Sequence, residues 1–532
     1  MIGEAIRGQS RVGRVDAVPT GGAIFLSPNR LRWLSLLPPV LLAVAALVVL
    51  ALTGFDGLYG QDSFAYFHYA TGPLRQGLLH LQPPPAFFWP PGYPLLVALT
   101  SAIVGINPLA GQIVSIAAGA AVPAFTILLA AEMSKSDQPE ATNRRWQLIP
   151  LLAGLIVAVT GQLLQSSLVV MADTLGLAFA TSGAWAFVRY RRTGKARWLA
   201  ISAAAFAGAI ITRWIYGLVA LPFALWSLVL LARRPRRVAL RHGAGAATVA
   251  ATILGPVLVP AIAGLITGGT ASFAGDLQVY SWSPLNALRR VFMTADGELS
   301  YTLPHGIYYA IAPALWWYFS PALALLVLPG LRAVLRRGAM PSAYLLVAWV
   351  AIVYAFHAGA PWQNPRFALA YLPPLAILAA LGFAQLQSAA HQKIRQAATI
   401  TLVGGLALAA AGSVVLTNEF IERKQNDVAT VRWSERLAPA NAQLLTFGST
   451  ATFQQYGRLE TLDLSELGSA KIEALLSDGR PTLVLLDVPG IERQWTGRPP
   501  WVNYRSLRDG PGLVPLGVRN GVTLFLVRPG TP

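Results

Sequence analysis

The chain has 532 residues, of which 55% are hydrophobic and 12% charged, and its net charge is +18. A soluble globular protein carries about 25% charged residues. The composition therefore excludes an ordinary soluble domain and indicates a polytopic membrane protein. Cysteine is absent, which excludes a disulfide framework and a thiolate metal site.

The first 32 residues are polar and carry five arginines, and we predict that 1–32 form a cytoplasmic N-terminal tail. The next run is long and lacks a small-residue cleavage site, so it is interpreted as a retained signal anchor. Beyond it, apolar runs recur along the chain. They predict eleven spans, near 33–53, 109–131, 148–164, 172–188, 198–211, 214–232, 243–267, 308–330, 342–357, 367–387 and 396–416.

One further apolar run, 91–106 (PGYPLLVALTSAIVGI), is short for a span. Cytoplasmic loops retain Lys and Arg, so charge can place this run. If 91–106 lies along the outer surface and the N-terminus is inside, cytoplasmic segments hold 23 of the 41 basic residues and outer loops hold 5. A spanning 91–106 would remove that asymmetry. We therefore predict a juxtamembrane helix there, and the positive charge is a topology signal that requires no nucleic acid.

The tail, 418–532, is charged and balanced. Its segments LLTFGS, PTLVLLD and VTLFLV are typical of short strands, and SELGSAKIEALLSD predicts a helix with a Ser cap and a Glu in its first turn. We expect a small extracytoplasmic α/β domain. A stabilising or docking module without chemistry is the simpler interpretation of that domain.

Two outer carboxylates adjoin predicted spans. Asp62 lies in GQDSFAYFHYA, just past the first span, and Asp173 lies in VVMADTLGLAFA, at the outer start of the fourth. Both residues would suit helix N-caps. Alternatively, a carboxylate among aromatic side chains has a raised pKa and can act as a general base on a hydroxyl. The two would meet if the first and fourth spans pack together.

Few cations face the same side. Arg213 (ITRWIYG) lies in the hairpin between the fifth and sixth spans, and Arg366 (PWQNPRFALAYLPP) opens the tenth. An arginine fork fits a phosphate, while snorkelling to lipid headgroups is the alternative role. Four histidines are also predicted outside, without a metal-ligand spacing.

Four segments resemble one known group, the GT-C glycosyltransferases that use lipid-phosphate sugars, in particular the bacterial protein mannosyltransferase and aminoarabinose transferase branch. These segments are GQDSFAYFHYA, PPPAFFWPPGYPLLVAL, VVMADTLGLAFA and NPRFALAYLPPLAILAALG. The resemblance covers about 33–417. The expected fold is an all-α GT-C-like bundle of about 11 transmembrane helices, with juxtamembrane helices in the first outer loop and the α/β tail domain.

The resemblance implies an inverting transfer of a sugar, hexose or pentose, from a polyprenyl-phosphate donor to an acceptor hydroxyl on a lipid, an envelope glycan or a protein, outside the inner membrane. Asp62 would be the base and Asp173 would assist, while Arg366 and Arg213 would bind the donor phosphate. The implied substrate-binding residues are Tyr66, His80, Tyr93 and Gln363.

Some relatives carry an acidic residue in the Pro-rich segment that helps to hold a metal, and residues 81–94 contain none. No cofactor is therefore assigned, and a divalent metal on Asp173 and His80 stays open. Two other functions are kept as alternatives. A flippase or transporter would place polar residues deep within spans, and a structural protein would tolerate the loss of both outer carboxylates.

Overall fold

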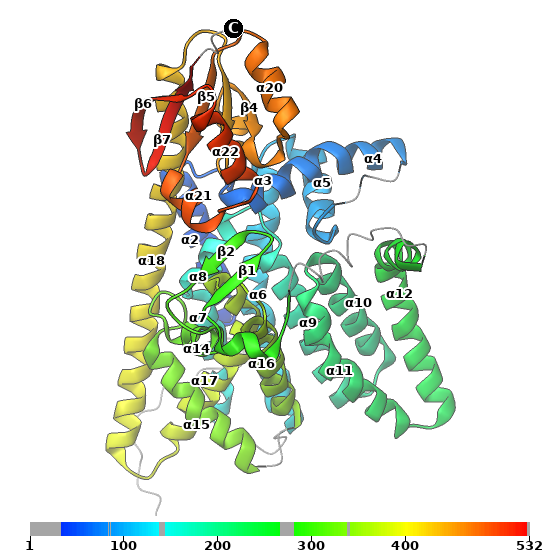
Figure 1. Cartoon of the computed structure of the whole chain (residues 1–532). Coiled ribbons are helices and arrows are strands. Elements are labelled where there is room, and N and C mark those ends of the chain that lie inside the picture. Colours follow the sequence, from blue (N-terminus) through cyan, green and yellow to red (C-terminus); the bar gives the residue numbers. More distant parts are fainter. Residues whose placement is uncertain are drawn as a thin grey trace, which may run out of the picture.

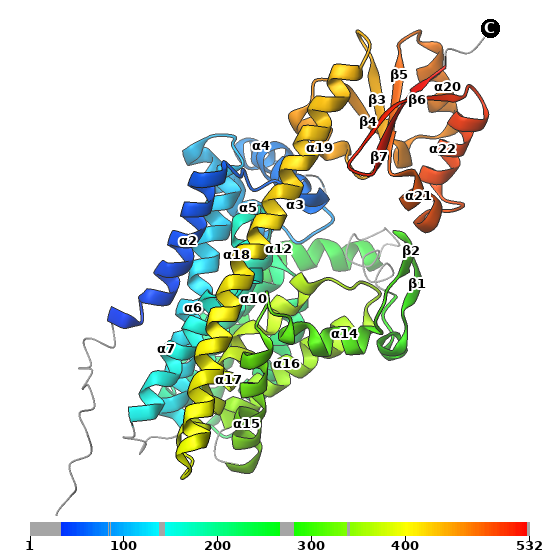
Figure 2. The ribbon, with the colours of Figure 1, turned by 90° about the vertical axis from the view of Figure 1, so that its left-hand side faces the viewer.

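The computed structural model describes residues 33–82, 85, 87–137, 144–266, 281–337 and 341–528. It consists of a helical bundle with a small α/β domain at one end (Figures 1 and 2). The predicted cytoplasmic tail, 1–32, lies outside these residues. The first helices are α2 (Leu37–Thr53), α3 (Gly60–Tyr69), α4 (Arg75–His80), α5 (Gly92–Val104), α6 (Leu109–Asp137), α7 (Arg144–Ala158), α8 (Gly161–Leu168) and α9 (Asp173–Thr193).

The bundle continues with α10 (Ala196–Thr212), α11 (Ile215–Ala232), α12 (Arg236–Ile266), α14 (His305–Ile311), α15 (Pro321–Arg337), α16 (Pro341–Gly359), α17 (Leu372–Gln387) and α18 (Gln392–Leu437). Helix α6 lies at the centre of the first half, where it packs against α2, α5, α7 and α9. Helix α17 packs against α7, α15 and α18, which joins the two halves.

Six of the described helices are long and apolar enough to cross a membrane, and the bent pair α7 and α8 would make a seventh. Helices α2 and α10, both predicted as spans, are each 17 residues long and fall just short. Helix α5 has 13 residues, about 20 Å at 1.5 Å per residue, against a hydrocarbon core of about 30 Å. The length of α5 therefore fits the predicted juxtamembrane role of 91–106.

Two predicted spans are wrong in detail. The run 148–164 is broken, because α7 ends at Ala158 and α8 departs at 59° to it. The run 308–330 contains the end of α14, a 3₁₀ turn (Ala312–Ala314) and an irregular stretch before α15 begins at Pro321. Ser320 adopts a φ of 74°, a left-handed conformation that ends one segment and allows the proline to open the next.

The C-terminal domain contains a five-stranded sheet of order β4-β3-β5-β7-β6. The three strands β3, β4 and β5 are parallel, while β7 runs antiparallel to both β5 and β6. Its strands are β3 (Gln443–Thr446), β4 (Glu460–Asp463), β5 (Thr482–Leu486), β6 (Leu513–Arg519) and β7 (Val522–Val527). Its helices are α19 (Thr450–Tyr456), α20 (Ser469–Ser477), α21 (Val488–Gln494) and α22 (Pro499–Asp509).

The three strands predicted in the tail are present as β3, β5 and β7. The predicted Ser cap of the tail helix is wrong. Helix α20 begins at Ser469 after Gly468, and no acidic residue lies in its first turn. Ser465 instead follows Asp463, whose carboxylate accepts hydrogen bonds from both the backbone and the hydroxyl of Ser465.

Helix α18 connects the two parts. It has 46 residues, so the predicted eleventh span and the start of the tail form one continuous helix that ends beside β3. Figure 2 shows α18 running the length of the bundle and reaching the sheet. A second small element, the hairpin β1 (Val291–Thr294) and β2 (Gly297–Ser300), lies between the bundle and α21 in both views.

Candidate active site

Asp62 lies in the first turn of α3, and the start of that helix is fixed by its neighbour Ser63. The Tyr59 backbone N–H donates to the Ser63 hydroxyl at 2.7 Å, and that hydroxyl donates to the Tyr59 carbonyl at 2.8 Å. Tyr59 is the N-cap residue, and no side chain caps the helix. The Asp62 carboxylate is therefore not consumed by capping and can serve another purpose.

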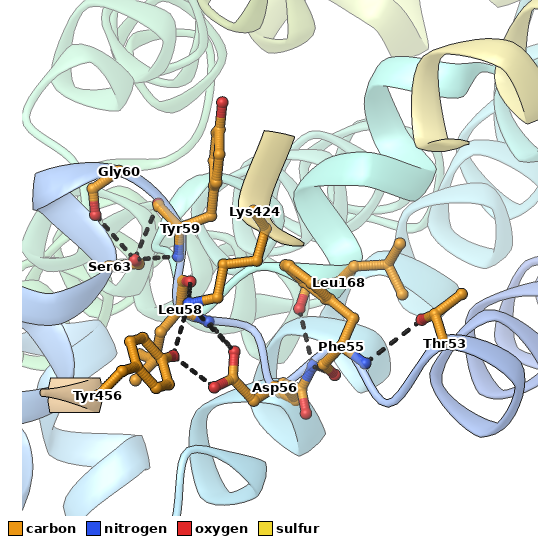
Figure 3. Close-up of polar contacts among 11 residues, drawn as sticks. Thr53, Phe55, Asp56, Leu58, Tyr59, Gly60, Ser63, Leu168, Lys424 and Tyr456 are labelled. Carbon is orange, nitrogen blue, oxygen red and sulfur yellow. Dashed lines mark hydrogen bonds and ion pairs between the residues drawn. The ribbon is translucent and has the colours of Figure 1, made fainter. Parts of the chain in front are cut away.

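The loop before α3 is anchored to the segment that leads into α9. The Gln112 side-chain amide donates to the carbonyls of Phe55 and Leu168, at 3.0 and 3.2 Å. The Val170 N–H donates to the Gly57 carbonyl at 2.9 Å. These bonds join the chain just before Asp62 to the chain just before Asp173; Figure 3 shows Phe55 and Leu168 side by side.

Asp173 is the first residue of α9, and Arg213 lies between α10 and α11. The carboxylate of Asp173 is only 5% exposed, and its Oδ1 forms an ion pair with Arg213 Nη1. Ala172 holds the cap position of α9, and no side-chain cap bond is made. Asp173 is thus a buried carboxylate in the first helical turn, where the helix dipole favours its charge.

Arg366 joins the two carboxylates. It is the second residue of a 3₁₀ helix (Pro365–Tyr371) whose cap, Asn364, accepts a hydrogen bond from the Arg366 N–H at 3.0 Å. Its Nη2 donates to Asp62 Oδ2 at 3.0 Å, and its Nε lies 3.7 Å from Asp173 Oδ2. The acids do not meet through packing of the first and fourth spans, since α2 and α9 each pack against α6.

These four residues form a continuous chain of charges, Asp62–Arg366–Asp173–Arg213. Among the residues that the structure describes, the buried Nε of Arg366 and Oδ2 of Asp173 have no hydrogen-bond partner. A buried polar atom without a partner costs about 1–3 kcal/mol. The two atoms face each other as an ion pair at 3.7 Å, so each keeps hydrogen-bonding capacity that a polar ligand could use.

A cavity of about 340 Å³ opens beside three of these residues. Its charged groups are Asp173, Arg213 and Arg366, which leaves one positive charge in excess. The rest of its wall is mainly apolar and aromatic: Tyr66, Trp89, Pro90, Trp214, Ile215, Tyr216, Gly217, Leu218, Trp282, Phe356, His357, Ala360, Trp362, Phe367, Leu369 and Ala370. Mostly apolar walls with a few convergent charged groups are the usual composition of a ligand site.

Phe367 holds the two guanidinium groups in place. Its ring centroid lies 5.7 Å from Cζ of Arg213 and 5.4 Å from Cζ of Arg366, and it stacks on His357 at 5.1 Å. Sequence reasoning missed Phe367 and the tryptophans of the wall. The available signal was their position, because Trp89, Trp214, Trp282 and Trp362 all lie in loops or at helix ends, where tryptophan usually marks the membrane interface.

The four predicted substrate-binding residues are placed differently from one another. Tyr66 lines the cavity, where its ring stacks on Trp89 at 4.9 Å, and burial raises the pKa of its phenol. Tyr93 is fully buried, and its hydroxyl bonds the Gly111 carbonyl and Ser115. Gln363 donates to the Leu303 carbonyl at 2.6 Å. His80 ends α4 and borders a separate surface depression.

Metal binding was left open on Asp173 and His80. These two residues line different depressions, and Asp173 is engaged by two arginines. Across the described ranges, no group of three or more His, Cys, Asp or Glu residues is arranged to hold a metal ion. The cations that line the cavity are the guanidinium groups of Arg213 and Arg366.

No protein-family model matches the sequence, and no curated protein matches it. Among solved structures, the chain is similar to the crystal structure of ArnT from Cupriavidus metallidurans bound to undecaprenyl phosphate. The TM-score is 0.58 at 12% identity, over 92% of this chain and 97% of that one. The apo state of the same protein gives a TM-score of 0.56 at 12% identity, over 93% and 98%. The chain thus has the GT-C fold, which confirms the fold expected from the sequence motifs.

Proposed function

We propose that this protein is an integral-membrane glycosyltransferase that moves a hexose or pentose from a polyprenyl-phosphate donor to an acceptor hydroxyl, with inversion at the anomeric carbon. The observation that carries the proposal is the charge chain Asp62–Arg366–Asp173–Arg213 beside a largely apolar cavity. The similar ArnT structure contains undecaprenyl phosphate, which supports a lipid phosphate as the ligand of this fold.

A phosphodiester suits the cavity by charge. The two arginines and Asp173 leave a single positive excess in the wall, and a sugar-phosphate-lipid diester carries one negative charge. The Nε–H of Arg366, which makes no hydrogen bond in the described structure, is a donor to a phosphate oxygen. Charge-assisted bonds of this kind are about twice as strong as neutral ones. Asp173 would act by pairing with both guanidinium groups, which would fix their positions relative to the leaving phosphate.

Asp62 fits the role of general base, because its carboxylate is about one-third exposed and only its Oδ2 is engaged by Arg366. The acceptor hydroxyl would give its proton to Asp62 while its oxygen attacks the anomeric carbon. The bond from that carbon to the phosphate oxygen breaks, and its electron pair leaves with the polyprenyl phosphate. Arg366 and Arg213 would stabilise the developing charge on that phosphate.

The sidedness of the reaction is part of the proposal. We place the N-terminus in the cytoplasm and the C-terminal domain outside the inner membrane, which the excess of Lys and Arg in the predicted cytoplasmic segments supports. Most of the cavity residues lie in loops or at helix ends. Nucleotide sugars are not available outside the inner membrane, whereas a lipid phosphate can deliver both the sugar and its leaving group. The acceptor would be a lipid, an envelope glycan or a protein.

The test is a transfer assay on purified full-length protein with radiolabelled polyprenyl-phosphate sugars and mixed envelope acceptors. We expect transfer by the wild type and loss of transfer in Asp62→Asn. The matched control is Glu298→Gln, which removes an exposed carboxylate on β2 and should leave the rate unchanged. Equal turnover by Asp62→Asn and wild type would refute the assignment of the base, and lipid movement without glycosidic product would favour a flippase.

A further inference from the structure

The first observation is a polar cluster that ties the C-terminal domain to the loop before α3. It comprises Asp56, Leu58, Lys424 and Tyr456, and we call it the α18 joint. Lys424 Nζ donates to the Leu58 carbonyl and to the Tyr456 hydroxyl, each at 2.5 Å, and lies 3.7 Å from Asp56 Oδ1. The Tyr456 hydroxyl donates to Asp56 Oδ2. Figure 3 shows these side chains converging from three separate segments.

The α18 joint acts on α3 through an aromatic contact. Lys424 Nζ lies 3.9 Å from the ring centroid of Tyr456 and 5.2 Å from that of Phe64, and the two rings meet edge to face at 6.1 Å. Phe64 is two residues after Asp62 in α3. Burial raises the pKa of the Tyr456 phenol, and its bond to Asp56 adds to the shift, so the hydroxyl stays protonated as a donor.

The second observation is a contact between the same domain and the β1–β2 hairpin, which we call the hairpin joint. Gln494 Nε2 donates to the Asp296 carbonyl at 2.6 Å, and Arg498 Nη1 donates to the Ala295 carbonyl at 2.9 Å. Gly297, at φ 86°, approaches the Gln494 carbonyl so closely that a Cβ atom there would collide with it. The hairpin joint therefore depends on the turn residues of the hairpin.

The hairpin joint reaches the cavity wall within a few residues. The Trp362 indole N–H donates to Asp296 Oδ2 at 3.0 Å, and Trp362 lines the cavity. The Tyr309 hydroxyl donates to the Trp362 carbonyl at 2.7 Å and accepts from the Asn364 N–H at 3.2 Å. Asn364 caps the 3₁₀ helix Pro365–Tyr371, whose second residue is Arg366.

The two joints and the site form a closed ring of contacts. The ring runs from the C-terminal domain through Tyr456 to α3 and Asp62, across to Arg366, and back through Trp362 and the hairpin to α21. We propose that the C-terminal domain sets the separation of Asp62 and Arg366, with Tyr456 and Arg498 as positioning residues. This inference rests on the proposed function and gives the C-terminal domain a role beyond docking.

Positioning matters because a displacement of about 1 Å at a reacting group can cost about 10²-fold in rate. The two joints should act on different parameters. Tyr456 supports the helix that carries the proposed base, so Tyr456→Phe should lower kcat about 10-fold with donor KM unchanged. Arg498 supports the segment that carries the proposed phosphate ligand, so Arg498→Met should raise donor KM about 10-fold.

The experiment measures kcat and donor KM for the full-length variants in the transfer assay. The lysine side chain can also donate to the Ala295 carbonyl, so Arg498→Lys should restore most of the loss. Two control variants repeat the substitutions elsewhere in the C-terminal domain. They are Tyr504→Phe in α22 and Arg480→Met, whose native side chain pairs with Glu460 at 2.7 Å. If the C-terminal domain were only loosened in general, kcat and donor KM would change alike in Tyr456→Phe, Arg498→Met and the two control variants. That result would overturn the proposal.

Hydrogen–deuterium exchange supplies a readout that needs no activity. Tyr456→Phe should speed exchange in 60–69, and Arg498→Met should speed it in 362–371, while the controls change neither. Unchanged exchange rates in both segments would refute the proposed ring of contacts, whatever the values of kcat and donor KM. If the wild type transfers no sugar but exchange changes as expected, the ring stands and the proposed function fails.

Discussion

Asp56 and Asp62 lie six residues apart, and their side chains are almost equally exposed, at 34% and 35%. Each is paired with one cation from a distant segment. The Lys424 ammonium opposite Asp56 also bonds a carbonyl and a phenol, whereas the Arg366 guanidinium opposite Asp62 keeps a buried Nε that makes no hydrogen bond in the described structure. Exposure therefore does not distinguish Asp56 from the proposed base Asp62, whereas the unused hydrogen-bonding capacity of the cation opposite each carboxylate does.

The largest difference between the two carboxylates is expected when the charge of each is removed in turn. Asp62→Asn should lower kcat by about 10²–10⁴-fold, the usual contribution of a general base, and leave the melting temperature within the error of wild type. Asp56→Asn should lower the melting temperature and reduce kcat by much less. Rates and thermal melts of the two variants, prepared side by side, check this. Equal kinetic losses would remove the distinction.

The next test concerns the cation opposite Asp62. Arg366→Gln removes the ion pair with Asp62 and the charge beside Asp173, so kcat/KM for the donor should fall about 10²-fold, the scale of a lost charge-assisted contact. The measurement is a donor titration of transfer rate. Arg480→Gln, at a surface ion pair of the C-terminal domain, is the control and should change little. An unchanged donor titration for Arg366→Gln would show that the phosphate binds elsewhere.

The next test concerns the β1–β2 hairpin, which contacts the C-terminal domain. Gly297→Ala places a Cβ atom against the Gln494 carbonyl and imposes strain at φ 86°, so activity should fall about 10-fold. Gly521→Ala, in the β6–β7 turn at φ 81°, adds similar strain with no atom within 4 Å of the new Cβ. Steady-state rates of the pair separate the collision from the strain, and equal losses would indicate strain alone.

The smallest expected effect is at Tyr93. Its hydroxyl bonds Gly111 and Ser115 in the core, so Tyr93→Phe leaves two buried groups short of a partner and should cost about 1–3 kcal/mol of stability. Donor KM should stay within about 2-fold of wild type, because in this structure the hydroxyl is satisfied away from the cavity. Thermal melts and donor titration measure the two quantities. A large rise in KM would restore the substrate-binding role predicted for Tyr93.

Local chemistry accounts for what the sequence predicted well. Apolar runs located most helices of the bundle, and the short, Pro-rich 91–106 was separated from the spans by charge. Hydropathy failed at 308–330, because Trp316, Trp317 and Tyr318 are apolar enough to extend a run that the chain breaks at Ser320. It failed again at 148–164, where the helix breaks before Gly161 and the apolar character continues.

The sequence predicted the charged residues of the candidate site but not how they pair. Short motifs pointed to Asp62, Asp173, Arg213 and Arg366. The bond between Asp62 and Arg366, however, joins residues 304 positions apart and depends on the packing of the whole bundle. The aromatic wall was missed for a related reason, since tryptophans at helix ends suit both a membrane interface and a ligand site. Only the fold decides between those two environments.

Helix α18 sets how far the C-terminal domain lies from the bundle and which way that domain faces about the helix axis. At 1.5 Å per residue its 46 residues extend about 69 Å, more than twice the hydrocarbon thickness of about 30 Å. One residue inserted after Asn418 would rotate everything beyond it by about 100°, while seven would nearly restore the direction and raise the domain by about 10 Å. The length of this single helix thus sets where the sheet domain can touch the bundle.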